Sequence, residues 1–272
     1  MTQKHDIHPN QSTELLKALH ILTNDGKLNQ DSRRKLKQVN HLVNFIKPLF
    51  DAVSLQNLPV TLVDHGAGKS YLGFMLYDLL MKHHENACVI GIETRGDLVQ
   101  KSVALANLCG FERMNFQHLT VAQSIESNTL PNQVEIVTAL HACNTATDDA
   151  IQFGLKKQAK YIVLVPCCQA EVAEVMRQHK NDSLSKTPLS ELWRHPIHTR
   201  EFGSQMTNVL RCLQLEAHGY NVTVTELVGW EHSMKNELII AKYTGQPRKN
   251  ARERIDAILQ QFNLQDLSHR FV

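Results

Sequence analysis

The sequence contains no apolar run that approaches the roughly 18 residues needed to cross a bilayer, which argues against a membrane span. Residues 1–11 are polar and lack the apolar stretch of a secretory signal. No internal repeat and no low-complexity tract interrupts the chain. These absences predict an ordinary globular protein that lies in the cytoplasm and does not associate with a membrane.

Cysteine is scarce and scattered, with six residues in a chain of 272. In a chain without a secretory signal, this pattern is typical of reduced thiols and not of a disulfide framework. No two cysteines form a C-x-x-C pair. A zinc site made of His141, Cys143, Cys167 and Cys168 is therefore poorly supported, and we expect no bound metal.

Neither sign of charge dominates, because the formal net charge is +2. Cations nevertheless gather towards the two ends of the chain, as Lys27, Arg33, Arg34, Lys35 and Lys37 and as Arg248, Lys249, Arg252 and Arg254. Such ends either contact the phosphates of a nucleic acid or form solvated helix faces, and the sequence leaves both interpretations open.

Short apolar runs alternate with helical patterns through the middle of the chain. We expect parallel strands at residues 60–63, 87–92, 115–119, 134–140 and 161–165. A long helix over 199–219 then precedes strands at 221–228 and 237–243, whose connection is too short for a crossover and which must be antiparallel. This order predicts an α/β fold with a Rossmann-like, seven-stranded sheet that ends in an antiparallel hairpin.

Helical patterns flank the predicted sheet on both sides. The first covers residues 12–24, with Ser12 or Thr13 as its N-cap, and a longer helix begins at Asp31 or Ser32. An amphipathic tail helix covers 252–264, and residues 182–196 form an excursion from the main fold. We therefore divide the chain into a helical extension (1–58), an α/β domain (59–245) and a helical tail (246–272).

The stretch Asp64-His65-Gly66-Ala67-Gly68-Lys69-Ser70 joins the first strand to a helical pattern. A phosphate loop needs four residues between its first glycine and its Gly-Lys pair, and this stretch has one. Tyr71 occupies the place of the third glycine of a dinucleotide fingerprint. A carboxylate before the glycines repels pyrophosphate and attracts a cation. S-adenosylmethionine carries an ammonium and a sulfonium, so the turn favours this cofactor.

A second acid, Glu93, ends the second predicted strand. An acid in this place accepts hydrogen bonds from ribose hydroxyls, so Asp64 and Glu93 are expected to hold opposite ends of one ligand. The alternative is two solvated acids at strand ends. The expected cofactor site comprises Asp64, Gly66, Ala67, Gly68, Tyr71, Glu93, Thr94, Leu140 and His141. No acid follows the third strand to bind the adenine amino group, and Gln117, Thr120 and Gln123 are the polar alternatives there.

Four motifs in order resemble those of one family. Asp64 to Leu72 resembles the D-x-G-x-G-K-G/S-Y/F-L form of motif I, and the other three lie at 139–148, 165–168 and 231–236. The set is similar to class I S-adenosylmethionine-dependent methyltransferases, in the methyltransferase-like group related to acceptor-stem tRNA 2′-O-methyltransferases. Asn144 stands where that group has glycine, so the turn after the fourth strand differs from its pattern.

The resemblance implies methyl transfer at the ends of the fourth and fifth strands, next to His141, Asn144, Cys167 and Cys168. His141 either acts as a base for a hydroxyl acceptor or shapes the turn. The cysteines either provide a nucleophile for a pyrimidine or fill the pocket floor as small apolar groups.

Substrate contacts are expected from His232, Lys235 and Asn236, before the last strand, and from Arg33 and Arg34 in the helical extension. Lys235 suits a phosphate. We therefore expect a methyltransferase that acts on RNA, either tRNA or rRNA. The alternatives are a protein or small-molecule methyltransferase and a non-catalytic scaffold. No stable protein partner follows from the sequence.

Overall fold

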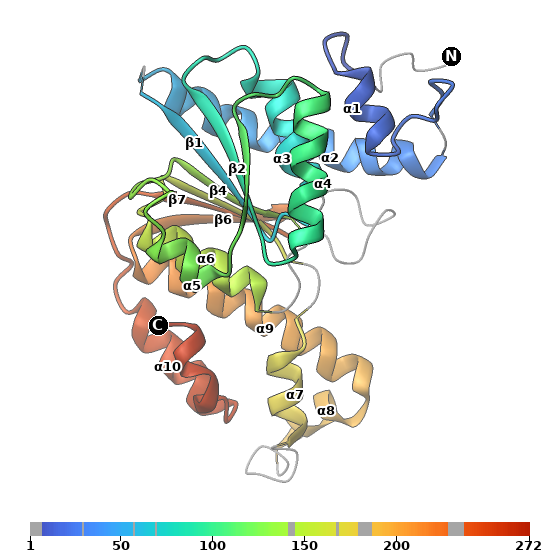
Figure 1. Cartoon of the computed structure of the whole chain (residues 1–272). Coiled ribbons are helices and arrows are strands. Elements are labelled where there is room, and N and C mark those ends of the chain that lie inside the picture. The colour runs from blue at the N-terminus through green and yellow to red at the C-terminus, as the bar shows by residue number, and fades with distance from the viewer. Residues whose placement is uncertain are drawn as a thin grey trace.

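The computed structural model describes residues 7–28, 30–56, 58–68, 70–140, 145–166, 169–178, 187–227 and 237–272. In these residues a seven-stranded sheet has the order β3-β2-β1-β4-β5-β7-β6 (Figure 1). The strands are β1 (Val60–His65), β2 (Ala87–Glu93), β3 (Met114–His118), β4 (Ile136–Leu140), β5 (Tyr161–Val165), β6 (Tyr220–Glu226) and β7 (Glu237–Tyr243).

Strands β1 to β5 are parallel, whereas β7 is antiparallel to both β5 and β6. Every residue of β1 and β5 is buried, as expected of central strands that are covered on both faces. The predicted α/β sheet and its terminal hairpin are therefore confirmed. Because β7 runs against β5, its first residue lies at the same sheet edge as the carboxyl ends of β4 and β5.

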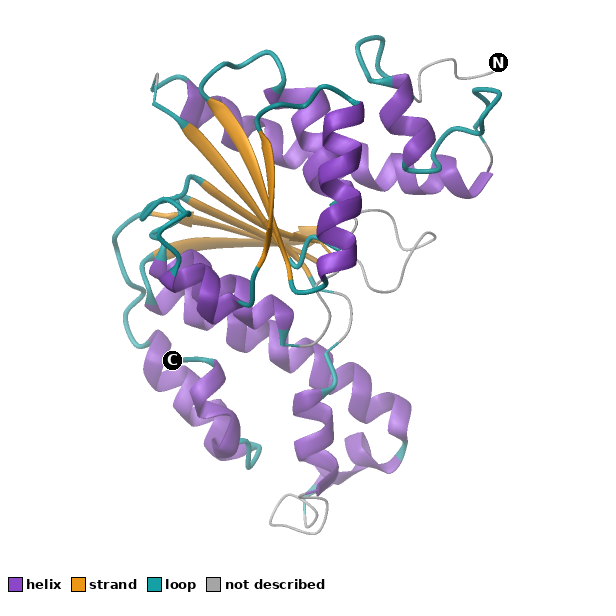
Figure 2. Cartoon of the chain, in the orientation of Figure 1, coloured by secondary structure: helices purple, strands orange, loops and turns teal. Residues whose placement is uncertain are grey.

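Helices cover both faces of the sheet (Figure 2). One face carries α1 (Thr13–Ala18), α2 (Gln30–Ser54), α3 (Tyr71–Leu76), the π-helical turn η1 (Tyr77–Met81) and α4 (Gly96–Leu108). The other carries α5 (Val121–Glu126), α6 (Ala146–Lys156) and α9 (Pro196–Ala217). Against α9 pack α7 (Glu171–Gln178), α8 (Glu191–Arg194), α10 (Ala251–Gln261) and η4 (Gln265–Arg270), and η3 (Pro188–Ser190) packs against α8.

The N-terminal helices share a continuous apolar core with the sheet. Leu16 of α1 and Ile46 of α2 belong to the same buried cluster as Leu62 of β1. The division of the chain at residues 58 and 59 therefore remains a prediction, because the packing joins the helical extension to the α/β part. The helical tail likewise packs on α9 through Ile255 and Leu259.

Several helix ends differ from the sequence expectation. Ser12 caps α1 by accepting a bond from the Leu15 amide, but the helix stops at Ala18 instead of continuing to residue 24, because His20 adopts a φ of 55°. The tail helix α10 ends at Gln261 instead of residue 264. Of the expected excursion over 182–196, the described part forms η3 and α8 and enters α9.

Gly203 sets the distance between α7 and α9. A Cβ atom at this position would lie 2.8 Å from both the Cβ and the backbone nitrogen of Ala173. Gly203→Ala should therefore lower the free energy of unfolding by about 1–3 kcal/mol through overpacking. Urea unfolding measures this, with Gln205→Ala on the exposed face of α9 as the control. A Gly203→Ala protein as stable as the wild type would contradict the close approach of the helices.

Candidate functional site

The turn after β1 exposes backbone to a ligand. Gly66 and Gly68 have φ angles of 65° and 56°, and Ser70 has 47°. These left-handed values favour glycine at the first two positions. A Cβ atom on Gly68 would lie in ordinary van der Waals contact, 3.9 Å from Arg95 Nη2 and from Glu93 Oε2, so the positive φ and not a lack of space favours glycine here. The Ala67 amide bonds to the carbonyl of Ile92 at 3.0 Å, which joins the turn to the end of β2.

Glu93 at the end of β2 is bound to the same turn. Its Oε2 accepts a hydrogen bond from the Gly68 amide at 2.7 Å, and its Oε1 accepts bonds from the Arg95 amide at 3.0 Å and from Thr94 Oγ1 at 3.3 Å. Burial disfavours the ionised carboxyl, but the hydrogen bonds from Arg95 and Gly68 outweigh it and lower the pKa of Glu93. Glu93 is therefore an ionised acceptor at neutral pH, as ribose hydroxyls require.

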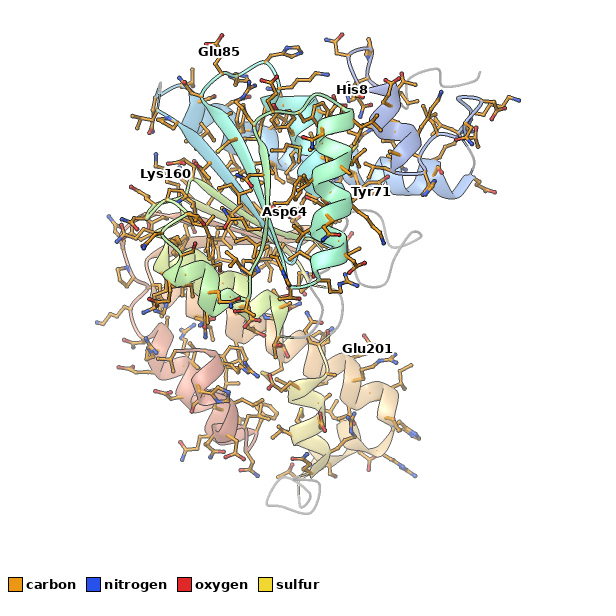
Figure 3. The ribbon with its side chains drawn as sticks, viewed as in Figure 1. His8, Asp64, Tyr71, Glu85, Lys160 and Glu201 are labelled. Atoms are coloured by element: carbon orange, nitrogen blue, oxygen red, sulfur yellow. The ribbon has the colours of Figure 1, made fainter. Side chains whose placement is uncertain are left out.

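Asp64 lies inside the fold and not at the surface of the turn. Its side chain is 2% exposed, its Oδ1 accepts a bond from Thr138 Oγ1 at 2.9 Å, and its Oδ2 accepts one from Ser70 Oγ at 3.3 Å. A Cβ atom on Gly73 would lie 3.2 Å from Asp64 Oδ2, so this glycine lets α3 approach the carboxylate. Asp64 therefore lies inside the fold (Figure 3), beneath the turn whose Ser70 it bonds.

Two further polar groups beside the turn are buried without hydrogen-bond partners among the described residues. They are the two ring nitrogens of His65 and the hydroxyl of Tyr71. Burial lowers the pKa of His65 to about 4, against the opposing effect of Glu93, so its ring is neutral at pH 7. Burial also raises the pKa of Tyr71. Unpaired buried groups cost free energy that a bound polar molecule recovers.

The described residues therefore fit S-adenosylmethionine. An ionised acid for the ribose, a glycine turn whose first glycine is exposed and a buried carboxylate beneath it lie together at the ends of β1 and β2. His65 is the residue that the sequence interpretation missed. Its position next to Asp64 offered no signal, because only the structure shows that both ring nitrogens lack partners.

The other predicted site residues divide into three groups. Ala67, Thr94 and Leu140 lie at the ends of β1, β2 and β4, as expected. Arg33 is exposed on α2, and the side chain of Arg34 is not described. Seven residues lie outside the described part of the chain, namely His141, Asn144, Cys167, Cys168, His232, Lys235 and Asn236.

The polar alternatives for the adenine are already engaged. Thr120 and Gln123 form a capping box at the start of α5, and Gln117 Oε1 accepts a bond from Thr129 at 3.0 Å. Over the described ranges, no helix is long and apolar enough to cross a membrane. The same ranges contain no group of three His, Cys, Asp or Glu side chains that could hold a metal ion.

Residues 34–175 match the family described as "Methyltransferase domain". The chain therefore belongs to this family. A curated relative, the glutathione S-transferase C-terminal domain-containing protein of Bos taurus, is 25% identical over 248 residues. The match covers 79% of this chain and 34% of the relative, so the chain spans about a third of that protein's length.

Solved structures are similar at low sequence identity. A Podospora anserina methyltransferase bound to S-adenosylhomocysteine is 10% identical, with a TM-score of 0.48, over 86% of this chain and 88% of that one. Aeropyrum pernix fibrillarin with bound S-adenosyl-L-methionine is 11% identical, with a TM-score of 0.41, over 68% and 66%. These likenesses concern the fold only.

Asp64 makes stability depend on pH in a defined direction. Burial raises the pKa of Asp64 from its ordinary value of 3.8 to about 6, against the hydrogen bonds from Thr138 and Ser70. The folded state therefore holds this proton more tightly than the unfolded state, and the free energy of unfolding falls as pH rises through this window. The Asp64→Asn variant lacks this titrating group. As pH rises from 3.8 to about 6, the free energy of unfolding of the variant, relative to that of the wild type, should therefore rise by about 2–4 kcal/mol.

Urea unfolding of both proteins from about pH 3.5 to about pH 7.5, a range that spans both pKa values of Asp64, measures this difference. The lowered pKa of His65 makes stability rise with pH, but it acts in both proteins and cancels from the difference. Asp97→Asn, at an exposed carboxyl on α4, is the control. A difference that does not change with pH would contradict the raised pKa of the buried Asp64 carboxyl.

Proposed function

We propose that the protein transfers a methyl group from S-adenosylmethionine to RNA, and that the ends of β1 and β2 hold the cofactor. The observation that carries the cofactor site is the bond between the Gly68 amide and Glu93, because it joins the glycine turn to an ionised acid. Glu93 binds the ribose, and Gly66, Ala67 and Gly68 offer open backbone to the rest of the cofactor.

Asp64 acts on the cofactor from beneath the turn. Its carboxylate is buried, so its negative potential is screened less than that of a surface acid. This potential favours a cationic ligand above the turn, while Ser70 and Thr138 fix the carboxylate. Tyr71, Thr94 and Leu140 complete the proposed cofactor site.

The pairing of β4 and β5 supports the proposed methyl-transfer site. Leu140 and Val165 are register partners, so the chain leaves both strands at the same level of one sheet edge. We assign His141 and Asn144 to one side of this site and Cys167 and Cys168 to the other. His141 acts as the base or shapes the turn, and the cysteines provide a nucleophile or fill the pocket floor.

Two features support RNA as the substrate. One is the resemblance of the four motifs to the tRNA methyltransferase-like group, and the other is the exposed cations, including Arg33 on α2 and Arg252 on α10. The cations near the two ends of the chain do not form one continuous RNA-binding surface, because α2 and α10 lie on opposite sides of the sheet (Figure 1). Arg248 is also paired with Glu216 at 2.8 Å. We therefore propose α2, together with Lys235, Asn236 and His232, as the RNA-binding part.

Methyl incorporation from radiolabelled S-adenosylmethionine into an unmodified tRNA transcript tests this function. We expect RNA affinity to fall linearly with the logarithm of salt concentration. Replacing Arg33 and Arg34 together by glutamate should weaken RNA binding by about tenfold or more and reduce the salt slope. Lys47→Glu, at the other end of α2, is the matched control.

The alternatives predict different outcomes of the same assay. Cofactor turnover with a protein or small-molecule acceptor, but without RNA, would indicate the second class of methyltransferase. A folded protein that binds no S-adenosylmethionine would indicate the scaffold. Equal loss of RNA binding in the Lys47→Glu control would contradict the assignment of the N-terminal end of α2.

A further inference from the structure

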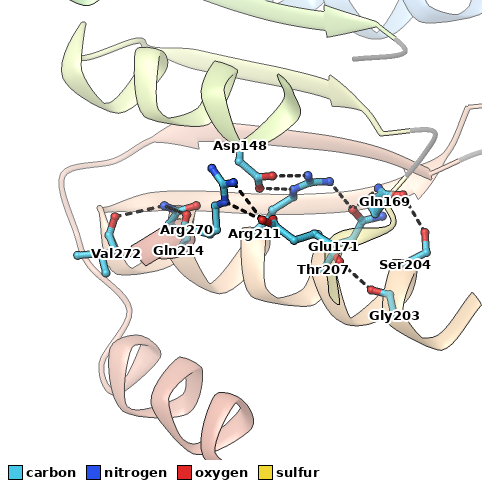
Figure 4. Close-up of polar contacts among 11 residues, drawn as sticks. Asp148, Gln169, Glu171, Gly203, Ser204, Thr207, Arg211, Gln214, Arg270 and Val272 are labelled. Carbon is cyan, nitrogen blue, oxygen red and sulfur yellow. Dashed lines mark hydrogen bonds and ion pairs between the residues drawn. The ribbon is translucent and has the colours of Figure 1, made fainter. Parts of the chain in front are cut away.

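Helix α9 carries a buried polar cluster, which consists of Asn208 and Arg211 with Asp148, Gln169 and Glu237. Arg211 donates from Nε to Asp148 Oδ1 and from Nη2 to Oδ2, both at 2.7 Å (Figure 4). Arg211 Nη1 also donates to Asn208 Oδ1 at 3.2 Å. The two α9 residues are therefore linked to each other, one turn apart on the same helix face.

Asn208 connects the cluster to two further elements. Its Oδ1 accepts a bond from Gln169 Nε2 at 2.9 Å, and its Nδ2 donates to Glu237 Oε2 at 2.6 Å. The other end of the Gln169 amide accepts a bond from Ser204, also on α9, at 2.8 Å (Figure 4). One helix thus fixes three side chains that belong to three separate parts of the chain.

The positions of these three side chains in the fold are alike. Asp148 lies in the first turn of α6, which follows β4, and Gln169 lies between β5 and α7. Glu237 is the first residue of β7. Strands β4, β5 and β7 are neighbours, so Asp148, Gln169 and Glu237 all lie at the sheet edge where β4 and β5 end and β7 begins. We call these three side chains the anchors.

Four members of the cluster are buried and bonded, whereas Glu237 at its edge is half-buried. Arg211 is 0% exposed, and Asp148, Asn208 and Gln169 are at most 6% exposed. A buried polar network whose members are satisfied holds one arrangement, since any other leaves a charge or an amide unpaired. The cluster differs in its burial from an ion pair such as Arg194 with Glu191, whose side chains are both exposed.

We propose that Asn208 and Arg211 are positioning residues for methyl transfer. They fix the placement, relative to one another, of the first turn of α6, of Gln169 before α7 and of the start of β7. The inference rests on the proposed function, which puts methyl transfer at this sheet edge. Neither residue belongs to the glycine turn or bonds to Glu93, so cofactor binding does not depend on them.

An exchange of the two polar partners tests the proposal. Asn208→Asp keeps the acceptor for Gln169 and Arg211 but replaces the donor to Glu237 by a second carboxylate oxygen. The double variant Asn208→Asp with Glu237→Gln restores a donor and an acceptor across the same contact. Glu237→Gln alone and the exposed Gln205→Ala on α9 are the controls.

Three readouts separate positioning from a general loss of folding. In Asn208→Asp, amide hydrogen exchange should increase at residues 169–173 and 237–240 and stay unchanged in β1 and β2. The affinity for S-adenosylhomocysteine and the KM for S-adenosylmethionine should stay within about twofold, while kcat with the tRNA transcript falls about tenfold or more. The double variant should recover most of the exchange protection and of kcat.

Different results would overturn the positioning role and the proposed methyltransferase function. A wild-type protein that binds no S-adenosylhomocysteine would overturn the proposed function, whereas the exchange measurements would still decide whether α9 fixes the three anchors. Wild-type exchange and kcat in Asn208→Asp would overturn the positioning role. So would an equal increase of exchange in β1 and β2, or a double variant as impaired as the single one.

Discussion

Replacing Arg211 by methionine should lower the free energy of unfolding by about 3–5 kcal/mol, the largest stability effect that we expect from a single side chain of this protein. Asp148 is 4% exposed, and both of its carboxylate oxygens accept bonds from Arg211 at 2.7 Å. Without the guanidinium, this carboxylate remains buried beside a methionine that carries no donor. Urea unfolding at pH 7 measures the loss.

The double variant Asp148→Leu with Arg211→Met identifies the cause. Replacing both members of a buried pair by apolar groups is often neutral or stabilising, because neither charge is then desolvated. The double variant should therefore recover most of the stability that Arg211→Met loses. A single variant within about 1 kcal/mol of the wild type would show that the pair contributes little.

Replacing Glu93 by alanine should weaken the binding of S-adenosylhomocysteine by about a hundredfold, the largest effect that we expect on cofactor binding. Hydrogen bonds to a charged group contribute about 1.5–3 kcal/mol each, and a ribose offers two hydroxyls to this carboxylate. The variant also removes the acceptor of the Gly68 amide, which lies 2.7 Å from Glu93 Oε2. Calorimetric titration measures the change in affinity.

Two controls make this result specific. Glu93→Gln keeps the size of the side chain but loses the charge, so it should bind more weakly than the wild type and better than Glu93→Ala. Glu126→Gln, at an exposed position of α5, should bind as the wild type does. Unchanged affinity in Glu93→Ala would contradict the assignment of Glu93 to the ribose.

The positions of the strands along the chain could be predicted from the sequence because each buried strand is a short apolar run. The stretch Tyr161–Val165 is apolar at every position, which predicts a central parallel strand, and the structure buries all of it. The hairpin of β6 and β7 followed from the short connection between them. Helix ends were less predictable, because His20 and its positive φ end α1 where the apolar pattern continues.

The role of Asp64 could be predicted only in part. Its place before the glycines marked the turn, but its bond to Thr138 depends on the pairing of β1 with β4, in which Asp64 and Thr138 are register partners. The α9 cluster gave no local signal, since Arg211 lies 63 positions from Asp148 and Asn208 lies 39 positions from Gln169. A lone arginine in a helix is ordinarily solvated, and its burial here is a property of the tertiary fold.

Calorimetric titration of the wild-type protein with S-adenosylmethionine and S-adenosylhomocysteine, beside Asp64→Asn, tests the central claim most directly. We predict one site per chain with an affinity in the micromolar range for the wild type. Asp64→Asn should remain folded and bind both ligands more weakly, because the buried charge beneath the turn is gone. A folded wild-type protein that binds neither ligand would contradict the assignment of the β1 and β2 ends as a cofactor site.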